Sequence, residues 1–150
     1  MDAVTYPNEK VIDFISANFI ALRIASDAEP YAADFMVNWT PRIIVLDSFG
    51  LTHQSTVGFL PPEEFIASLE LGLAKGDFNL KNLDDCKKRL DRILETQPQS
   101  ISAPEAVYLR GVTAYKLGGD AGQLKEAYRT LQDKYPESEW AQRALPYRLL

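Results

Sequence analysis

The chain has 150 residues, of which 46% are hydrophobic and 25% charged, so it carries enough apolar side chains for one or two packed cores. Sixteen Lys and Arg residues against 21 Asp and Glu residues leave a net charge of −5, which argues against nucleic acid or an anionic membrane as a partner. No apolar run is long enough to cross a bilayer, and residues 1–4 lack the basic start of a signal peptide, so we expect a cytoplasmic protein.

The first half of the chain alternates helical and strand patterns. Asn8 can cap a helix, and two runs rich in β-branched residues predict buried strands. Ser48-Phe49-Gly50 supplies a turn into a more polar strand, which predicts an antiparallel hairpin. The expected elements are a helix after Asn8, a strand at 19–24, a short helix at 29–37, strands at 42–47 and 52–59, and a helix opening at Pro61-Pro62.

From Gly76 onward the strand signal is lost and only helical stripes remain. Helices are expected at 83–94, 103–117, 124–131 and 139–145, separated by Pro and Gly signals. Pro98-Gln99-Ser100 recurs 38 positions later as Pro136-Glu137-Ser138, a period typical of α-solenoid units made of helix pairs. Two such units are few, so we expect the preceding α/β half to cover their open end.

The order Asn38-Trp39-Thr40-Pro41, followed by Val45-Leu46-Asp47-Ser48-Phe49-Gly50 and then by Val57-Gly58-Phe59 and a helix, resembles the second half of a thioredoxin domain. The resemblance implies a partial thioredoxin-like α/β fold over residues 1–75, arranged as helix, strand, helix, hairpin and helix. It also implies a cis bond between Thr40 and Pro41. In that family the residue before this proline offers its backbone to an extended peptide, which assigns a peptide-binding site to Trp39, Thr40 and Pro41. A rigid turn with a packed tryptophan is the alternative.

Residues 76–150 resemble tetratricopeptide repeats, with Ala106, Tyr108 and Gly111 near the small and aromatic positions of that pattern. Cys86 departs from it, because the family usually has alanine there. Tyr108, Tyr115 and Tyr128 could line a peptide groove, although aromatic residues at helical spacing are more often part of a core.

The resemblance also identifies what is missing. In thioredoxins the strand that leads to the Cys-x-x-Cys pair lies between the strands matching 19–24 and 42–47, and this sequence has neither that strand nor that motif. The two flanking strands could pair directly, pair with a second copy, or pair with chain upstream of Met1. The favoured function is a non-catalytic protein-interaction module that binds proteins or peptides. The alternatives are a fragment or mis-started form of a thiol-disulfide oxidoreductase whose Cys-x-x-Cys precedes Met1, and an obligate homo-oligomer formed through the open sheet.

Few residues are available for chemistry, because Cys86 and His53 are the only cysteine and histidine. This excludes an internal disulfide and the common Cys- or His-based metal sites, so we predict no metal, no cofactor and no catalytic residue. Cys86 lies on an apolar stripe and should be a buried, inert thiol, whereas His53 should be an exposed strand residue. The carboxylate pairs Glu63-Glu64 and Asp84-Asp85 each open a helix, where the helix dipole accounts for them.

Overall fold

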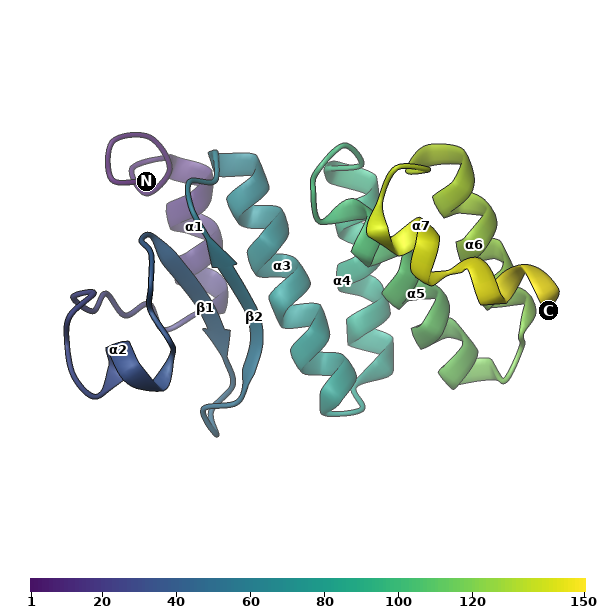
Figure 1. Ribbon diagram of the computed structural model, residues 1–150, viewed down its shortest axis with the longest axis horizontal. Coiled ribbons are helices and arrows are strands. Elements are labelled where there is room, and N and C mark those ends of the chain that lie inside the picture. The colour runs from purple at the N-terminus through teal and green to yellow at the C-terminus, as the bar shows by residue number, and fades with distance from the viewer.

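Seven α-helices and one two-stranded antiparallel sheet make up the chain, which confirms the expected combination of α and β elements. In the computed structural model, which describes residues 1–150, these elements form an elongated row with the hairpin toward one end and the last helices at the other (Figure 1). The elements are, in chain order, α1 (Glu9–Asn18), α2 (Tyr31–Asp34), β1 (Arg42–Leu46), β2 (Thr52–Val57), α3 (Pro62–Asn79), α4 (Leu83–Thr96), α5 (Ala103–Gly118), α6 (Gly122–Lys134), α7 (Glu139–Arg143) and a 3₁₀-helix (Leu145–Leu149).

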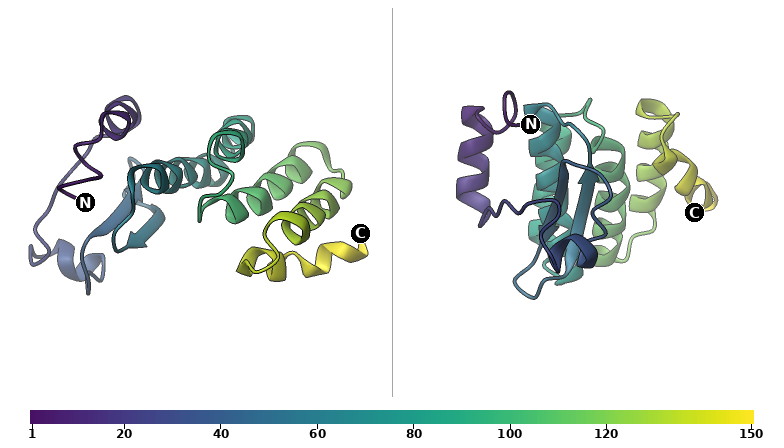
Figure 2. Two further views of the ribbon diagram at one scale, coloured as in Figure 1. Left: turned by 90° about the horizontal axis from the view of Figure 1, so that it is seen from above. Right: turned by 60° about the vertical axis from the view of Figure 1, so that its left-hand side comes forward.

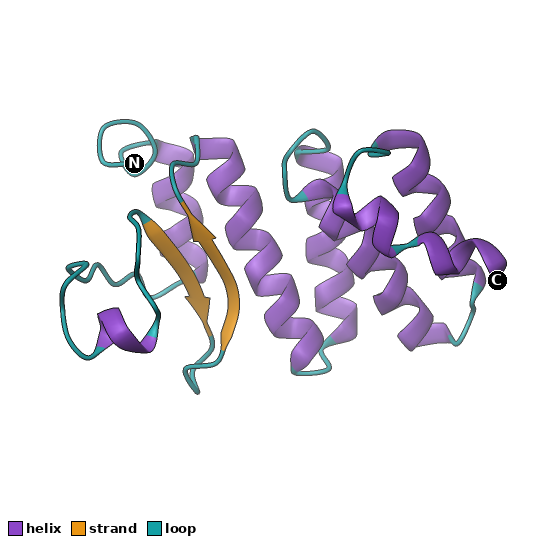
Figure 3. Cartoon of the chain, viewed as in Figure 1, coloured by secondary structure: helices purple, strands orange, loops and turns teal.

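The predicted hairpin forms from β1 and β2, and Figure 3 shows that it holds all the strand structure of the chain. Its turn is closed by Asp47, whose carboxylate accepts hydrogen bonds from the backbone N–H groups of Phe49 and Leu51, each 2.9 Å long. Gly50 has a φ of +80°, a left-handed conformation that a residue with a Cβ adopts only under strain. A short acidic side chain and a glycine thus reverse the chain here.

The strand predicted at 19–24 is wrong. This segment is a loop with no backbone hydrogen bond to another strand, and Ile20 and Leu22 are 94% and 81% exposed. A buried-strand pattern becomes a strand only where a neighbour accepts its hydrogen bonds, and β1 pairs with β2 alone. The helix expected at 29–37 is also shortened to the single turn α2, and Met36 follows it with a left-handed φ of 49°.

The first core joins α1 and the hairpin to α3. Helix α1 begins as expected, because the side chain of Asn8 accepts hydrogen bonds from the N–H groups of Lys10 and Val11. Its buried residue Val11 packs with Val45 of β1 and with residues of α3. Figure 2 shows α1 and the hairpin together at the N-terminal end of the row, beside α3. The buried side chains of this core are Val11, Val45, Phe65 and Leu69.

A glycine allows this close approach. A Cβ at Gly72 would lie 2.9 Å from Val45 Cγ2 and 3.0 Å from Gln54 Cβ, closer than carbon atoms pack in folded proteins. The absence of a side chain at Gly72 therefore brings the hairpin directly onto the backbone of α3.

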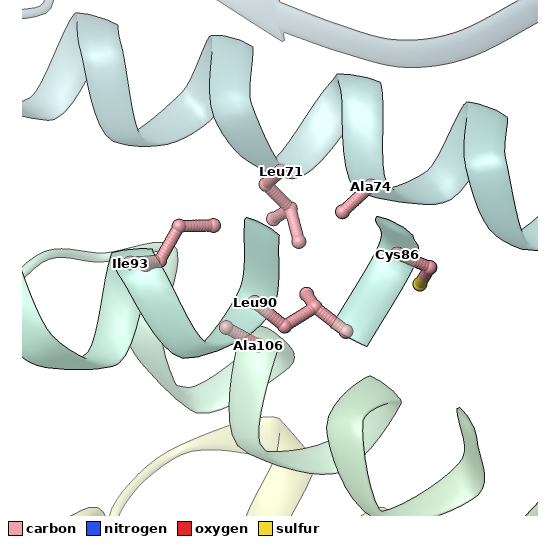
Figure 4. Packing of buried hydrophobic residues seen from close by; sticks show 6 residues of the cluster. All are labelled: Leu71, Ala74, Cys86, Leu90, Ile93 and Ala106. Atoms are coloured by element: carbon pink, nitrogen blue, oxygen red, sulfur yellow. The ribbon is translucent and has the colours of Figure 1, made fainter. Parts of the chain in front are cut away.

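The second core lies between α3, α4 and α5, as the close-up in Figure 4 shows. Leu90 and Ile93 of α4 point into it, and full burial of one such side chain stabilises the fold by about 1.5–3 kcal/mol. Since α3 contributes to both cores, the boundary expected between residues 75 and 76 falls within a continuous helix. The buried members of this core are Leu71, Ala74, Cys86, Leu90, Ile93 and Ala106.

The four helices predicted in the second half all form. Each packs mainly on its neighbours along the chain, as in an array of helix pairs, and the last expected helix ends at Arg143 before the 3₁₀-helix. Helices α5 and α6 approach closely at Gly111, where an added Cβ would lie 2.5 Å from the Cβ of Ala127. The repeated proline turns also touch, because the hydroxyl of Tyr135 donates to the carbonyl of Pro98 at 2.6 Å.

Ion pairs tie α3 to α4. Glu70, only 2% exposed, accepts from Arg89 Nη1 at 3.1 Å, and Asp77 accepts from Arg89 Nε at 2.8 Å. Burial by itself lowers the pKa of Arg89, but the hydrogen bonds that its guanidinium donates to both carboxylates outweigh burial, and the pKa of Arg89 is raised. Removing Arg89 would therefore leave the Glu70 carboxylate buried with its main partner gone, an expensive arrangement.

Candidate functional site

Trp39, Thr40 and Pro41 lie in the loop that leads from α2 into β1. The Trp39 side chain is 72% exposed, so it is not packed into a core. The Thr40–Pro41 peptide bond is cis, as is the bond between Glu29 and Pro30. The loop forms one wall of an open hollow of about 310 Å³, lined by Ser26, Val37, Asn38, Trp39 and Thr40.

Beside this loop, one edge of β1 is open. The N–H of Gly58 donates to the carbonyl of Pro41 at 2.9 Å. Two residues further along the chain, Ile43 of β1 lies opposite Thr56 in the same register. Because the residues of an antiparallel strand alternate in the direction of their backbone groups, the N–H and C=O of Ile44 point away from β2. The sheet has only two strands, so these groups have no backbone partner. An extended chain could pair with them.

The part of the chain that contains β1 and β2 is rich in exposed apolar side chains. Thirteen of the twenty exposed large hydrophobic residues precede residue 60, although this part is only about two fifths of the chain. Leu46 and Val57 belong to the hairpin itself, on the face turned away from α3, and Phe49 at its turn is 87% exposed. Where such residues form one contiguous patch, the patch marks a binding surface.

His53 is buried, which corrects the prediction of an exposed strand residue. The register shifts at Val45/Leu46, so that Gln54 pairs with Val45 and Thr52 with Leu46, and His53 is the extra residue of a β-bulge. A bulge redirects its extra side chain, and the imidazole lies against α3, where Gly76 leaves space for it.

Both ring nitrogens of His53 are occupied. Asn79 Nδ2 lies 3.0 Å from Nδ1, and Asp47 Oδ2 lies 3.0 Å from Nε2. If the Asn79 amide donates, the neutral ring carries its proton on Nε2 and donates it to Asp47. The pKa of the Asp47 carboxyl is lowered by the backbone N–H of Leu51 above all, and further by His53. With both nitrogens engaged, the ring holds the hairpin to α3 and has no free position for proton transfer to a ligand.

A second hollow, of about 260 Å³, lies between the hairpin and the helices. Its charged groups satisfy one another, because Lys75 pairs with Glu105 and also donates to Gln54 at 2.8 Å. Its aromatic residue Tyr108 is also engaged within the molecule. The Tyr108 ring packs on Trp140, and its hydroxyl lies 2.8 Å from the hydroxyl of Tyr147. The residues that line it are His53, Lys75, Phe78, Asn79, Glu105, Tyr108, Leu109 and Trp140.

The three tyrosines do not line one common groove. Tyr108 borders the second hollow, Tyr115 is exposed near the end of the same helix, and Tyr128 packs into the core between α5, α6 and α7. The structure therefore supports a mainly packing role for Tyr128 and leaves one tyrosine, Tyr108, at a candidate surface.

The remaining candidates occupy positions that explain them structurally. Cys86 is fully buried as predicted, 3.5 Å from the hydroxyl of Thr113, and burial raises the pKa of its thiol. The carboxylate of Glu64 accepts the backbone N–H of Ile101, and that of Asp85 pairs with Lys88. No group of three or more His, Cys, Asp or Glu side chains is arranged to hold a metal ion.

Arg42 is the site residue that the sequence patterns did not single out. It is the first residue of β1, is only partly exposed, and its buried Nε atom has no hydrogen-bond partner. A charged residue opening the apolar run 42–46 was the one available signal.

Comparison of the chain with protein-family models, curated proteins and solved structures found no match. None of its helices combines the length and the apolar character needed to span a membrane.

Proposed function

We propose that this chain is a non-catalytic protein-interaction module that binds an extended segment of a partner protein at the open edge of β1. The observation that carries the proposal is the unpaired backbone of β1 around Ile44, and the exposed Trp39 lies in the loop that leads into this strand. Main-chain hydrogen bonds along an edge supply affinity for any extended chain, and neighbouring pockets supply selectivity. We assign this role to the hollow beside Trp39, in the loop that precedes β1.

The finer fold assignment belongs to the same proposal. We propose that residues 1–75 are a partial thioredoxin-like fold and residues 76–150 a tetratricopeptide-like array. The order of α1, hairpin and α3 supports the first assignment, and the close packing at Gly111 supports the second. The resemblance assigns peptide binding to Trp39, Thr40 and Pro41, and this proposal agrees with it in that Thr40 and Pro41 lead directly into β1.

The hollow between the hairpin and the helices is the weaker candidate surface. Lys75 and Glu105 already neutralise each other there, and the polar tips of His53 and Tyr108 are bonded within the molecule. A ligand would have to break these contacts before making its own. The edge of β1 has no comparable internal partners, so we assign the interaction to the edge.

Strand addition can be tested with an array of nine-residue peptides of random sequence. Peptides that bind the folded protein are then resynthesised with N-methyl groups at either the odd or the even positions. A strand that pairs on one side uses the N–H groups of alternate residues, so one methylated series should lose binding and the other should keep it. Equal loss in both series, or binding of no peptide at all, would contradict the proposal.

Trp39 provides an independent readout. Trp39→Ala should weaken peptide binding by about tenfold or more, because a tryptophan covered by a ligand is often an energetic hot spot. Phe49→Ala is the matched control, since Phe49 is also an exposed aromatic but lies at the hairpin turn, away from the loop of Trp39. A second copy on the edge is the competing occupant, and a dimer seen by sedimentation equilibrium that dissociates on adding peptide would identify it.

A further inference from the structure

Arg42 differs from the other arginines of the chain. Six of the eight arginines lie within 4 Å of a carboxylate, and Arg148, one of the two that do not, is exposed. Arg42 has no ion pair although it is partly buried, and its Nε–H group is shielded from solvent without an acceptor. A buried hydrogen-bond donor on a charged group raises the free energy of the protein when it has no acceptor. A ligand group that accepts a hydrogen bond from this guanidinium removes that cost and so binds with a larger gain in free energy.

The backbone of Arg42 belongs to the open edge. The carbonyl of Pro41 accepts a hydrogen bond from the N–H of Gly58, so the backbone groups of Pro41 point toward β2. Because this direction alternates along a strand, the N–H and C=O of Arg42, the next residue, point away from β2. A chain added to the edge would therefore run beside Arg42 itself.

The side chain of Arg42 lies on the face of the hairpin that α3 does not cover. Ile43 and Val45 pack toward α3, and side chains alternate along a strand, so Arg42 and Ile44 are on the opposite face. On that face a residue of an added strand would have its Cβ about 5 Å from the Cβ of Arg42, within reach of a carboxylate side chain.

We infer that the segment bound at the open edge of β1 is acidic, with an Asp or Glu side chain that accepts hydrogen bonds from the guanidinium of Arg42. This inference rests on the proposed function and specifies the chemistry of the partner segment that the edge of β1 binds. Arginine presents Nε and Nη donors in a fork that matches a carboxylate, so a carboxylate that binds the Nη groups can also satisfy Nε once the atoms that shield Nε from solvent move aside. The net charge of −5 gives the protein as a whole no general attraction for acidic chains, so an acidic segment would be selected through its contact with the unpaired guanidinium of Arg42.

The test uses the same array of nine-residue peptides. Peptides that bind the wild-type protein should be enriched in Asp or Glu at one position, and replacing that residue by Gln or Asn in a labelled peptide should lower its affinity by about tenfold in fluorescence anisotropy. Arg42→Gln should abolish the difference between the acidic and the amide peptide. Arg42→Lys should restore part of it, because a lysine keeps the charge but loses the fork.

Arg148→Gln is the matched control, because it removes one positive charge from an unpaired arginine at the far end of the chain and should leave the preference unchanged. Unfolding of Arg42→Gln, followed by circular dichroism, checks that the fold persists. Peptides that bind without acidic enrichment, or a preference that survives in Arg42→Gln, would overturn this inference while leaving strand addition intact. If no peptide binds, the proposed function fails and this inference fails with it.

Discussion

The contact between α5 and α6 at Gly111 can be tested by adding a single methyl group. In Gly111→Ala the new Cβ would lie 2.5 Å from the Cβ of Ala127 and 3.1 Å from the carbonyl oxygen of Gln123. Carbon atoms pack best at about 3.5–4.0 Å, so the two helices must separate by an ångström or more.

Two opposing contributions set the size of the effect. Overpacking of this kind costs about 1–3 kcal/mol, and the severity of the overlap favours the upper end. Replacing a glycine inside a helix by alanine contributes about 1 kcal/mol in the opposite direction. Gly111→Ala should therefore lower the free energy of unfolding by about 1–2 kcal/mol, measured by urea denaturation with circular dichroism at the helical band.

Gly118→Ala is the control, because Gly118 lies in the same helix and an added Cβ there meets nothing within 4 Å. It should leave stability unchanged or raise it slightly. The double variant Gly111→Ala/Ala127→Gly moves the methyl group from one helix to the other. Its loss of unfolding free energy should be about 2 kcal/mol smaller than the summed losses of the two single variants. If Gly111→Ala stabilises the protein as Gly118→Ala does, the close approach of α5 and α6 is refuted.

Two further predictions concern single groups. Cys86 should resist iodoacetamide in the native protein and react in urea, because it is fully buried and burial raises its pKa; rapid labelling of the native state would show that α4 is not packed as described. The folded-state pKa of Asp47 is lowered from 3.8, chiefly by the N–H of Leu51, so its carboxylate contributes stability above the unfolded-state pKa that is lost as pH falls through the folded value. The stability advantage of the wild type over Asp47→Asn should therefore shrink between about pH 6 and about pH 2, and a constant difference would contradict it.

The helices of the second half could be predicted from the sequence because their determinants are local. The stripe of Cys86, Leu90 and Ile93 repeats at helical spacing, and α4 buries these three side chains. Pro98 and Gly119 mark helix ends for steric reasons that need no knowledge of distant residues. The burial of Cys86 followed from the same stripe, since a residue in register with the apolar face of a helix is placed in its core.

His53 could not be placed in this way, because its position depends on a bulge. Strict alternation from Gln54, which faces α3, turns His53 toward solvent. The register shift opposite Leu46 adds one residue to β2 and reverses that direction, and nothing in the residues Thr52 to Gln54 signals it. Its partner Asn79 lies 26 positions away in sequence, beyond the reach of local patterns.

The strand expected at 19–24 failed for a related reason, and the failure bears on function. The apolar run was correctly identified, but a strand exists only with a partner, and residues 20–24 remain exposed. The same limit applies to the proposed site. The resemblance suggests Trp39, Thr40 and Pro41, whereas the unpaired state of Arg42 depends on which carboxylates the fold brings near it.

The composition of β1 argues that its edge does not simply face water. Proteins protect a free edge with lysines, with a proline within the strand, with a short irregular strand or with a covering element. β1 is a strand of five residues, Arg42-Ile43-Ile44-Val45-Leu46, with one charge at its start. The bulge in its pairing with β2 adds its extra residue to β2, and α2 makes no packing contact with β1. Under the proposed function an extended segment of a partner pairs with this edge, and association of copies through the same edge is the competing outcome. The peptide array and the sedimentation experiment distinguish these two outcomes. If the protein remained monomeric and soluble and bound no extended peptide, the edge of β1 would not be a binding site, and the proposed function would be wrong.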